Sequence, residues 1–293
     1  MATASQIIAS ARYDLKEYKG QKMEPAELLE YLNRAVIILD GILISKDSDW
    51  VHKNAISVAL STGQNKITMP TRCASVRSIW YDTNLVTCTD LTFTASGDTI
   101  ISAATDFSDY FAANDTIGIS GSTSNDTDDI GLLSIYSIGD DGAGSNNKLT
   151  INEDVIVDEG TADATGTLMK VGSNEVLKES LDYIYYLRKF AATGSPYYWS
   201  YEGTNIVFDR QADDDYGLTI HYNQKAATLA TDDNMPYNGE FDEKLRAAVV
   251  MFAKQRNNEL DSVDIAIERM FNNAVMTKAI RRNYVPVFAK LDF

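Results

Sequence analysis

A long stretch without proline, residues 84–172, interrupts the helical patterns of this 293-residue chain. It carries fifteen Asp or Glu against only Lys148 and Lys170, a balance of −13 in a chain whose net charge is −16. Short β-prone runs alternate there with clusters of Gly, Asp and Asn, which is typical of a small antiparallel barrel or sandwich. We therefore predict an inserted all-β domain over residues 84–172.

Amphipathic helical patterns lie on both sides of this insertion. Residues 24–44 place apolar side chains at helical spacing, and Pro25 suits the first turn. Three further helices are predicted over about 174–190, 241–257 and 261–282. Because an amphipathic helix needs partners for its apolar stripe, the early and late helices are predicted to form one parent domain.

The segment GSPYYWSY at residues 194–201 opens a predicted β-meander over about 197–223. Alternation along the first strand puts Tyr197, Trp199 and Tyr201 on one face, and we expect these core aromatics to pack on the helices. An exposed platform that stacks on a ligand is the alternative interpretation of the same rings.

Together these patterns predict an α+β fold, in which a helical bundle with a small antiparallel β-meander carries the inserted barrel or sandwich. The predicted division is a core of residues 1–83 and 173–280, the insertion 84–172, and a C-terminal segment 281–293.

Residues that usually carry catalysis or bind metals are scarce. His52 and His221 are the only histidines, and no phosphate-binding or nucleophile-elbow motif occurs in a usable context. The acidic loop 125–131 begins like a calcium loop, but Ile130 and Ser137 stand where two ligands are required. We predict a protein that is no enzyme, with no catalytic residue, no cofactor and no metal site; an adventitious calcium site in this loop is the alternative.

Charge and hydropathy exclude further classes of function. A net charge of −16 argues against a simple nucleic-acid binder, because phosphate binding depends on clustered Lys and Arg. No apolar run is long enough to span a bilayer, and the N-terminus lacks the pattern of a signal peptide. Cys73 and Cys88 are expected to be thiols in a reducing compartment.

Several segments, taken in order, resemble one known family. They are VRSIWYD at 76–82, TGSPYYWSYEG at 193–203, the Asp-rich stretch 206–236 that ends in NMP, and the helix opening NGEFDEKLRAAVVMFAKQR at 238–256. This order resembles the head-to-tail connector or adaptor proteins of tailed bacteriophages. The resemblance covers about residues 25–83 and 173–280. The chain departs from it at 211–215, where the family often has prolines, and in the acidic insertion, which is outside the family's common core.

The resemblance implies a virion structural protein in the neck between head and tail, assembled in the host cytoplasm. Such adaptors form a ring, usually a dodecamer, that contacts the portal and the tail or nozzle proteins, closes the head and leaves a passage for the genomic DNA. It implies no sequence-specific DNA binding and no membrane. The insertion is expected on the outside of the ring, where it would contact neighbouring tail or fibre proteins.

The resemblance also assigns the C-terminal segment as a portal-docking arm, and its basic, aromatic composition after the last helix agrees with that role. The arm residues are Arg281, Arg282, Tyr284, Val285, Pro286, Phe288, Leu291 and Phe293. A terminus that is disordered in the isolated protein is the alternative. Two other functions stay open: a carbohydrate- or receptor-binding virion module that uses the β domain, and a hydrolase that uses a carboxylate pair.

Overall fold

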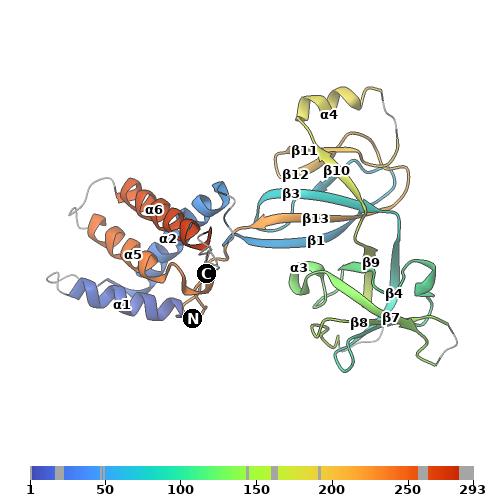
Figure 1. Cartoon of the computed structure of the whole chain (residues 1–293), viewed down its shortest axis with the longest axis horizontal. Helices are drawn as coiled ribbons and strands as arrows, with labels where there is room; N and C mark the ends of the chain where they lie inside the picture. The colour runs from blue at the N-terminus through green and yellow to red at the C-terminus, as the bar shows by residue number, and fades with distance from the viewer. Residues whose placement is uncertain are drawn as a thin grey trace, which may run out of the picture. The chain divides into compact units, whose positions relative to one another are not determined.

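The computed structural model describes residues 2–16, 23–46, 48, 50–142, 145–159, 164–190, 193–256 and 263–283 (Figure 1). Only the backbone is described at Asp128 and over residues 278–283. The chain forms two compact units. The helical unit comprises Met1–His52 and Gln224–Phe293, and the β unit comprises Lys53–Asn223.

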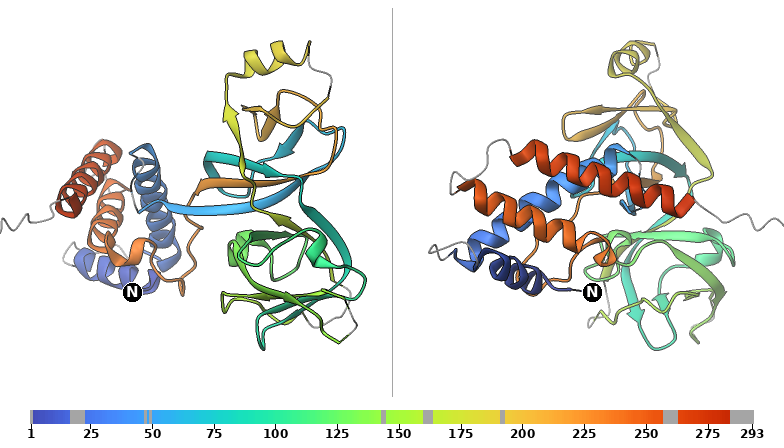
Figure 2. Two further views of the ribbon diagram at one scale, coloured as in Figure 1. Left: turned by 45° about the vertical axis from the view of Figure 1, so that its right-hand side comes forward. Right: turned by 60° about the vertical axis from the view of Figure 1, so that its left-hand side comes forward.

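Within its described residues, the helical unit contains α1 (Ala4–Lys16), α2 (Pro25–Ser45), α5 (Asp242–Arg256), α6 (Val263–Asn283) and the short 3-10 turn η2 (Tyr237–Gly239). Helix α5 packs against α1, α2 and α6, and Figure 2 shows it beside α6. Pro25 occupies the first turn of α2, where its missing N–H costs no hydrogen bond. The buried stripe of α2 recurs every three or four residues and consists of Leu28, Leu32, Ala35, Val36, Leu39 and Leu43.

The segment that leads into α5 is tied to α2 by polar contacts. The buried carboxylate of Asp40 accepts hydrogen bonds from the Ala226 N–H (2.8 Å) and from the Tyr237 hydroxyl (2.7 Å). Burial, followed by the charge of Asp40, raises the pKa of Tyr237, so its hydroxyl stays protonated and donates. Tyr237 has a φ of 64°, an uncommon conformation for an aromatic residue, and the bond to Asp40 holds it there.

The first layer of the β unit is a seven-stranded sheet in the order β1-β13-β3-β10-β11-β12-β2. Its strands are β1 (His52–Leu60), β2 (Lys66–Thr68), β3 (Cys73–Asp82), β10 (Asn174–Lys178), β11 (Tyr198–Glu202), β12 (Asn205–Phe208) and β13 (Tyr216–Gln224). The core under this sheet includes Ile79, Trp199, Phe208 and Leu218. Strand β13 lies between β1 and β3, and all of its residues except His221 are buried.

The pair β10–β11 is parallel, with Leu177 opposite Tyr198. A parallel pair needs a crossover connection, and the short helix α4 (Leu181–Leu187) lies in that connection (Figure 1). Helix α4 packs on β11. Its place at this crossover is what puts its tyrosines next to the aromatic strand β11.

The second layer of the β unit is a closed barrel, β4-β5-β8-β7-β6-β9. Its strands are β4 (Leu85–Thr94), β5 (Thr99–Ser102), β6 (Thr116–Ser120), β7 (Leu133–Gly139), β8 (Lys148–Ile151) and β9 (Ala164–Lys170). A 3-10 turn η1 (Phe107–Asp109) and a short helix α3 (Thr127–Ile130) accompany them. The barrel encloses its own core, which includes Phe93, Phe107 and Leu133. The barrel lies in sequence between β3 and β10, which pair with each other through Tyr81 and Asn174.

Two glycines let the barrel and the sheet approach closely. A Cβ on Gly118 of β6 would overlap with the Ser57 side chain of β1, and a Cβ on Gly217 of β13 would lie 3.0 Å from the Cβ of Met169 in β9. Any side chain at Gly118 would therefore force the two layers apart.

The predicted fold class, an α+β helical bundle with a small antiparallel meander, is wrong. Instead of a bundle with a small meander, the chain forms a seven-stranded sheet and a closed six-stranded barrel, with 31% helix. The strand segments before and after the barrel join the predicted meander in one large mixed sheet. The start of the predicted helix 174–190 is instead strand β10, which pairs with β3 and β11 and buries only Val176.

The boundaries between the two compact units fall after His52 and before Gln224 in the sequence. Strands β3 and β10–β12 therefore belong to the same unit as the barrel. The predicted division into 1–83 with 173–280, 84–172 and 281–293 cuts the chain at other positions. Among the described residues, none of the helices has the length and apolar character needed to cross a membrane.

Candidate docking surface

An exposed apolar patch extends over α4 and Phe190 after it, Leu177 of β10 and the start of β11. We call it the aromatic surface, and it consists of Leu177, Tyr183, Tyr186, Phe190, Tyr197 and Tyr198. Phe190 is 73% exposed, Tyr186 54% and Tyr197 53%. Single exposed apolar residues are ordinary, whereas a contiguous patch marks a candidate interaction site.

The rings of this surface contact one another in a chain. Tyr186 lies 5.0 Å from Phe190 and 6.3 Å from Tyr183 between ring centroids. Tyr183 packs edge-on against Tyr198 at 5.7 Å, and Tyr198 packs against Tyr197 at 5.0 Å. These separations are those of favourable aromatic pairs, so the rings hold one another in place.

Helix α4 presents these tyrosines because its two ends are fixed. The Ser180 hydroxyl accepts a hydrogen bond from the Tyr183 N–H (3.3 Å), which caps the N-terminus. Ile184 is fully buried and anchors the opposite face of the helix. A helix of seven residues does not form alone in water, so these contacts determine its presence.

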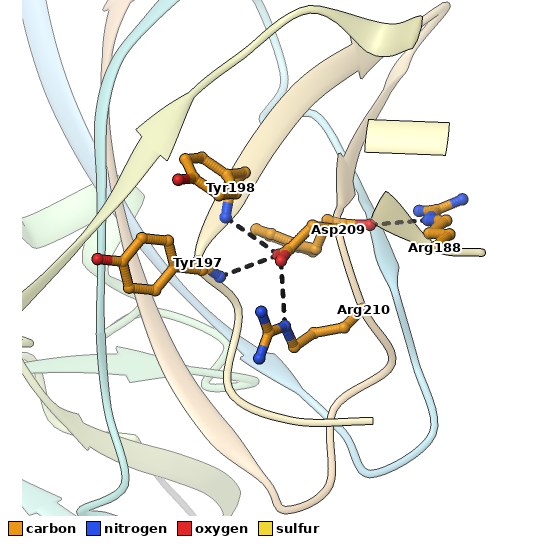
Figure 3. A network of polar contacts seen from close by, with 6 residues as sticks. Arg188, Tyr197, Tyr198, Asp209 and Arg210 are labelled. Carbon is orange, nitrogen blue, oxygen red and sulfur yellow. Dashed lines mark hydrogen bonds and ion pairs between the residues drawn. The ribbon is translucent and has the colours of Figure 1, made fainter. Parts of the chain in front are cut away.

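Arg188 ties the C-terminal end of α4 to the sheet. Its Nε donates to the carbonyl oxygen of Phe208 (2.8 Å; Figure 3), and its Nη2 donates to the carbonyl oxygen of Asn65 (3.1 Å). Its guanidinium carbon also lies 5.7 Å from the centroid of the Tyr185 ring. Arg188 is therefore the residue that positions the exposed face of α4.

Asp209 fixes the start of β11 in the same way. Its fully buried carboxylate accepts hydrogen bonds at 3.0 Å from the N–H groups of Tyr197 and Tyr198, and one from Arg210 Nε at 3.0 Å. Figure 3 shows these three donors converging on the carboxylate. Burial of a carboxylate costs least when it is both paired with a cation and hydrogen-bonded, and Asp209 meets both conditions.

Two tyrosines at and beside this surface, Tyr198 and Tyr185, have a raised pKa. Burial, followed by the neighbouring Tyr183 and Tyr197, raises the pKa of Tyr198. A hydrogen bond to Glu202 raises the pKa of Tyr185. Tyr198 and Tyr185 therefore offer hydroxyl groups without phenolate charge.

The three predicted core aromatics do not share one buried face. Trp199 is 1% exposed in the sheet core, and Tyr201 packs edge-on against it at 5.1 Å. The Tyr201 hydroxyl accepts a hydrogen bond from the Val76 N–H (2.7 Å), and Lys178 lies over both rings. Tyr197 precedes the strand and is exposed. Trp199 packs among strands of the sheet, where we had expected helices.

The tyrosines of α4 were not among the predicted site residues. The segment LDYIYYL at 181–187 has three tyrosines around one buried isoleucine, and this spacing was the available signal. A short amphipathic helix whose second face is aromatic does not reveal, by pattern alone, which face is buried.

The predicted docking arm lies almost wholly outside the described residues. Arg281 and Arg282 are in the last turn of α6, where only the backbone is described. The remaining arm residues, Tyr284, Val285, Pro286, Phe288, Leu291 and Phe293, lie beyond the described part of the chain.

Acidic side chains of the loop 125–131 and of the stretch 211–215 form hydrogen bonds within the fold. Asp213 accepts a bond from the Tyr216 hydroxyl (2.6 Å), Asp215 one from the Thr62 N–H (2.7 Å), and Asp126 one from the Ser122 N–H (2.8 Å). Within the part of the chain that the structure describes, no group of three His, Cys, Asp or Glu is arranged to hold a metal ion.

The histidines and cysteines are dispersed. His52 is exposed at the start of β1, and burial, followed by the charge of Arg77, lowers the pKa of the half-buried His221. Cys73 and Cys88 form no disulfide, and burial raises the pKa of the Cys88 thiol.

Comparison with protein families confirms the predicted resemblance to the head-to-tail adaptor proteins of bacteriophages, a class of structural proteins, over a little less than half of the chain. The matching family is described as SU10 adaptor protein, and it matches residues 149–288, which run from β8 beyond the end of α6. The match therefore includes the last strands of the barrel as well as the aromatic surface. No protein of curated function is significantly similar to the chain in sequence.

Proposed function

We propose that the protein forms a ring, a dodecamer, that joins the portal to the tail of a tailed bacteriophage, closes the filled head and leaves a passage for DNA. The observation that carries this proposal is the adaptor family match over residues 149–288. As a component of the virion neck, each copy would contact the portal on one side and tail or nozzle proteins on the other.

The arm 281–293 is proposed as the portal-docking element. From Arg269 to residue 293 the chain has five basic residues against Asp292 alone, so this end is positive in an otherwise acidic protein. Pro286 cannot continue a helix, which favours an extended segment after α6. An extended apolar and basic segment can order on binding to a groove in its partner.

The proposed DNA passage agrees with the charge of the protein. Outside the barrel the chain has a balance of −3 (−16 less −13), so it offers no excess of basic residues to hold the phosphate backbone, and DNA would move past the ring. The barrel, with its charge of −13, is proposed to lie on the outside of the ring, since one insertion from every copy would crowd a channel.

The test is the particle mass of the purified protein alone and mixed with the portal of its phage. We expect separate copies in the first case and a complete ring bound to the portal in the second. A chain that ends after Ile280 should keep the unfolding midpoint of the full protein and lose portal binding. A full-length protein that never associates with the portal would contradict the ring proposal, and full binding by the truncated chain would contradict only the arm assignment.

A further inference from the structure

The size of the aromatic surface limits what it can bind. With about 200 Å² for a fully exposed large side chain, the exposed fractions of Leu177, Tyr183, Tyr186, Phe190 and Tyr197 amount to about 500 Å². This is at the upper end for a monomer's largest apolar patch and below the roughly 800 Å² per partner of a stable complex. A contact at this surface alone is weak, and it becomes strong only when other contacts already hold the partner nearby.

The distribution of charge selects the kind of partner. The barrel segment 84–172 has a balance of −13, whereas the segment 174–202 that carries the aromatic surface has four acidic and three basic residues. A partner of opposite charge would gain most by contacting the barrel. Another copy of this acidic chain would be repelled by the barrel. Electrostatic repulsion is much weaker at the nearly neutral aromatic surface, so this surface is the better contact for a second copy.

We propose that the aromatic surface on α4 and the start of β11 is the lateral contact between neighbouring copies of this chain. This inference rests on the proposed ring. In a ring, one patch meets a different patch on the next copy, and every copy takes part in two such contacts. Closure of the ring then supplies the proximity that a contact of about 500 Å² requires.

The surface is ready for this contact before assembly. Arg188 and Ser180 fix α4, Asp209 fixes the N–H groups of Tyr197 and Tyr198, and the rings pack on one another. Aromatic side chains lose little rotational freedom on binding, and these rings are already ordered, so the entropy cost of the contact is small.

The first experiment places the photo-crosslinking residue p-benzoylphenylalanine at position 190 of the full chain, bound to its portal. We expect crosslinked products whose masses are multiples of the adaptor. The same residue at Tyr136, which is 66% exposed on the barrel, is the matched control and should give no such series. Crosslinks from position 190 only to the portal or another virion protein, or no crosslink at all in an occupied ring, would overturn the inference.

The second experiment uses Phe190→Glu, which adds an acidic charge to the proposed contact, and Tyr136→Glu as its control. Both positions are exposed, so both variants should keep the circular dichroism spectrum of the parent. We expect Phe190→Glu to raise the concentration needed for half-occupancy of the portal at least about tenfold, since the added repulsion recurs around the ring. Equal occupancy by the two variants would reject the lateral contact, while a parent protein that fails to bind the portal would instead reject the proposed function.

Discussion

The barrel and the seven-stranded sheet belong to one unit, yet they are built in opposite ways. The barrel takes all its strands from one continuous segment, 85–170, while the sheet combines strands from both sides of that segment. The barrel carries a balance of −13, whereas the rest of the β unit, residues 53–83 and 173–223, has nine acidic and eight basic residues. In this unit the barrel, which is formed by one continuous segment, carries most of the charge. The sheet, which is assembled from distant segments, carries the exposed aromatic surface.

The largest loss of stability is expected for Asp209→Ala in the sheet. The change leaves two buried N–H groups and Arg210 without their acceptor, so we expect a loss of about 3–5 kcal/mol in the free energy of unfolding. Chemical denaturation followed by tryptophan fluorescence measures it, since Trp199 lies next to the site. Asp209→Asn is the control, because an amide oxygen can still accept the two N–H groups and should lose less.

The next test is Gly118→Ala, at the contact between barrel and sheet. The added methyl group overlaps with Ser57, so we expect a loss of about 1–3 kcal/mol. Thermal unfolding of Gly118→Ala and Gly139→Ala gives the comparison, since a Cβ at Gly139 meets no atom within 4 Å. An equal loss in both variants would mean that strand propensity, and not the contact between layers, sets the cost.

A smaller effect is expected on the stability of the barrel at low pH, through the carboxylate of Glu159. Burial acts to raise the pKa of Glu159, but bonds from Ser122, Ser124 and Asn125 outweigh it and leave the pKa lowered. The carboxylate therefore stabilises the fold above its ordinary pKa, and this contribution disappears as pH falls through the lowered value. Unfolding midpoints between about pH 6 and pH 3 should fall less steeply in Glu159→Gln than in the parent.

The control for this test is Glu175→Gln, which removes one carboxylate from the exposed part of β10 in the sheet. An acid dependence that changes equally in the two variants would point to general charge repulsion, and would remove the role assigned to Glu159.

The smallest effect on stability is expected at the aromatic surface itself. Phe190→Ser removes a ring that is 73% exposed, so the free energy of unfolding should change by less than about 0.5 kcal/mol. Calorimetry of the isolated protein measures this. A loss of several kcal/mol would show that Phe190 supports the fold. Phe190 could then not be described as part of an exposed surface that is free to bind a partner.

The sequence was informative where structure is local. The barrel segment could be located from its turn clusters and its lack of proline, because each of its strands pairs with strands of the same segment. The helices over residues 24–44 and 241–257 could be located from their apolar spacing, and α2 and α5 lie there.

The large sheet could not be derived in the same way. Strand β10 has five residues, and its single buried side chain, Val176, gives no pattern that separates it from the helix that follows. The partners of β10 are β3, which precedes the barrel, and β11, which follows α4. The carboxylate of Asp209 likewise acts through contacts that depend on this assembled sheet, so no pattern around residue 209 indicates its role.

The pairing of β3 with β10 has a practical consequence for protein engineering. The chain leaves the sheet after Asp82 and returns at Asn174, on neighbouring strands that are in register at Tyr81 and Asn174. A short turn could therefore replace everything between them, and a foreign domain whose ends lie close together could be fused there. The protein thus contains a natural cassette site, at which a foreign domain could be attached without cutting the sheet that carries it.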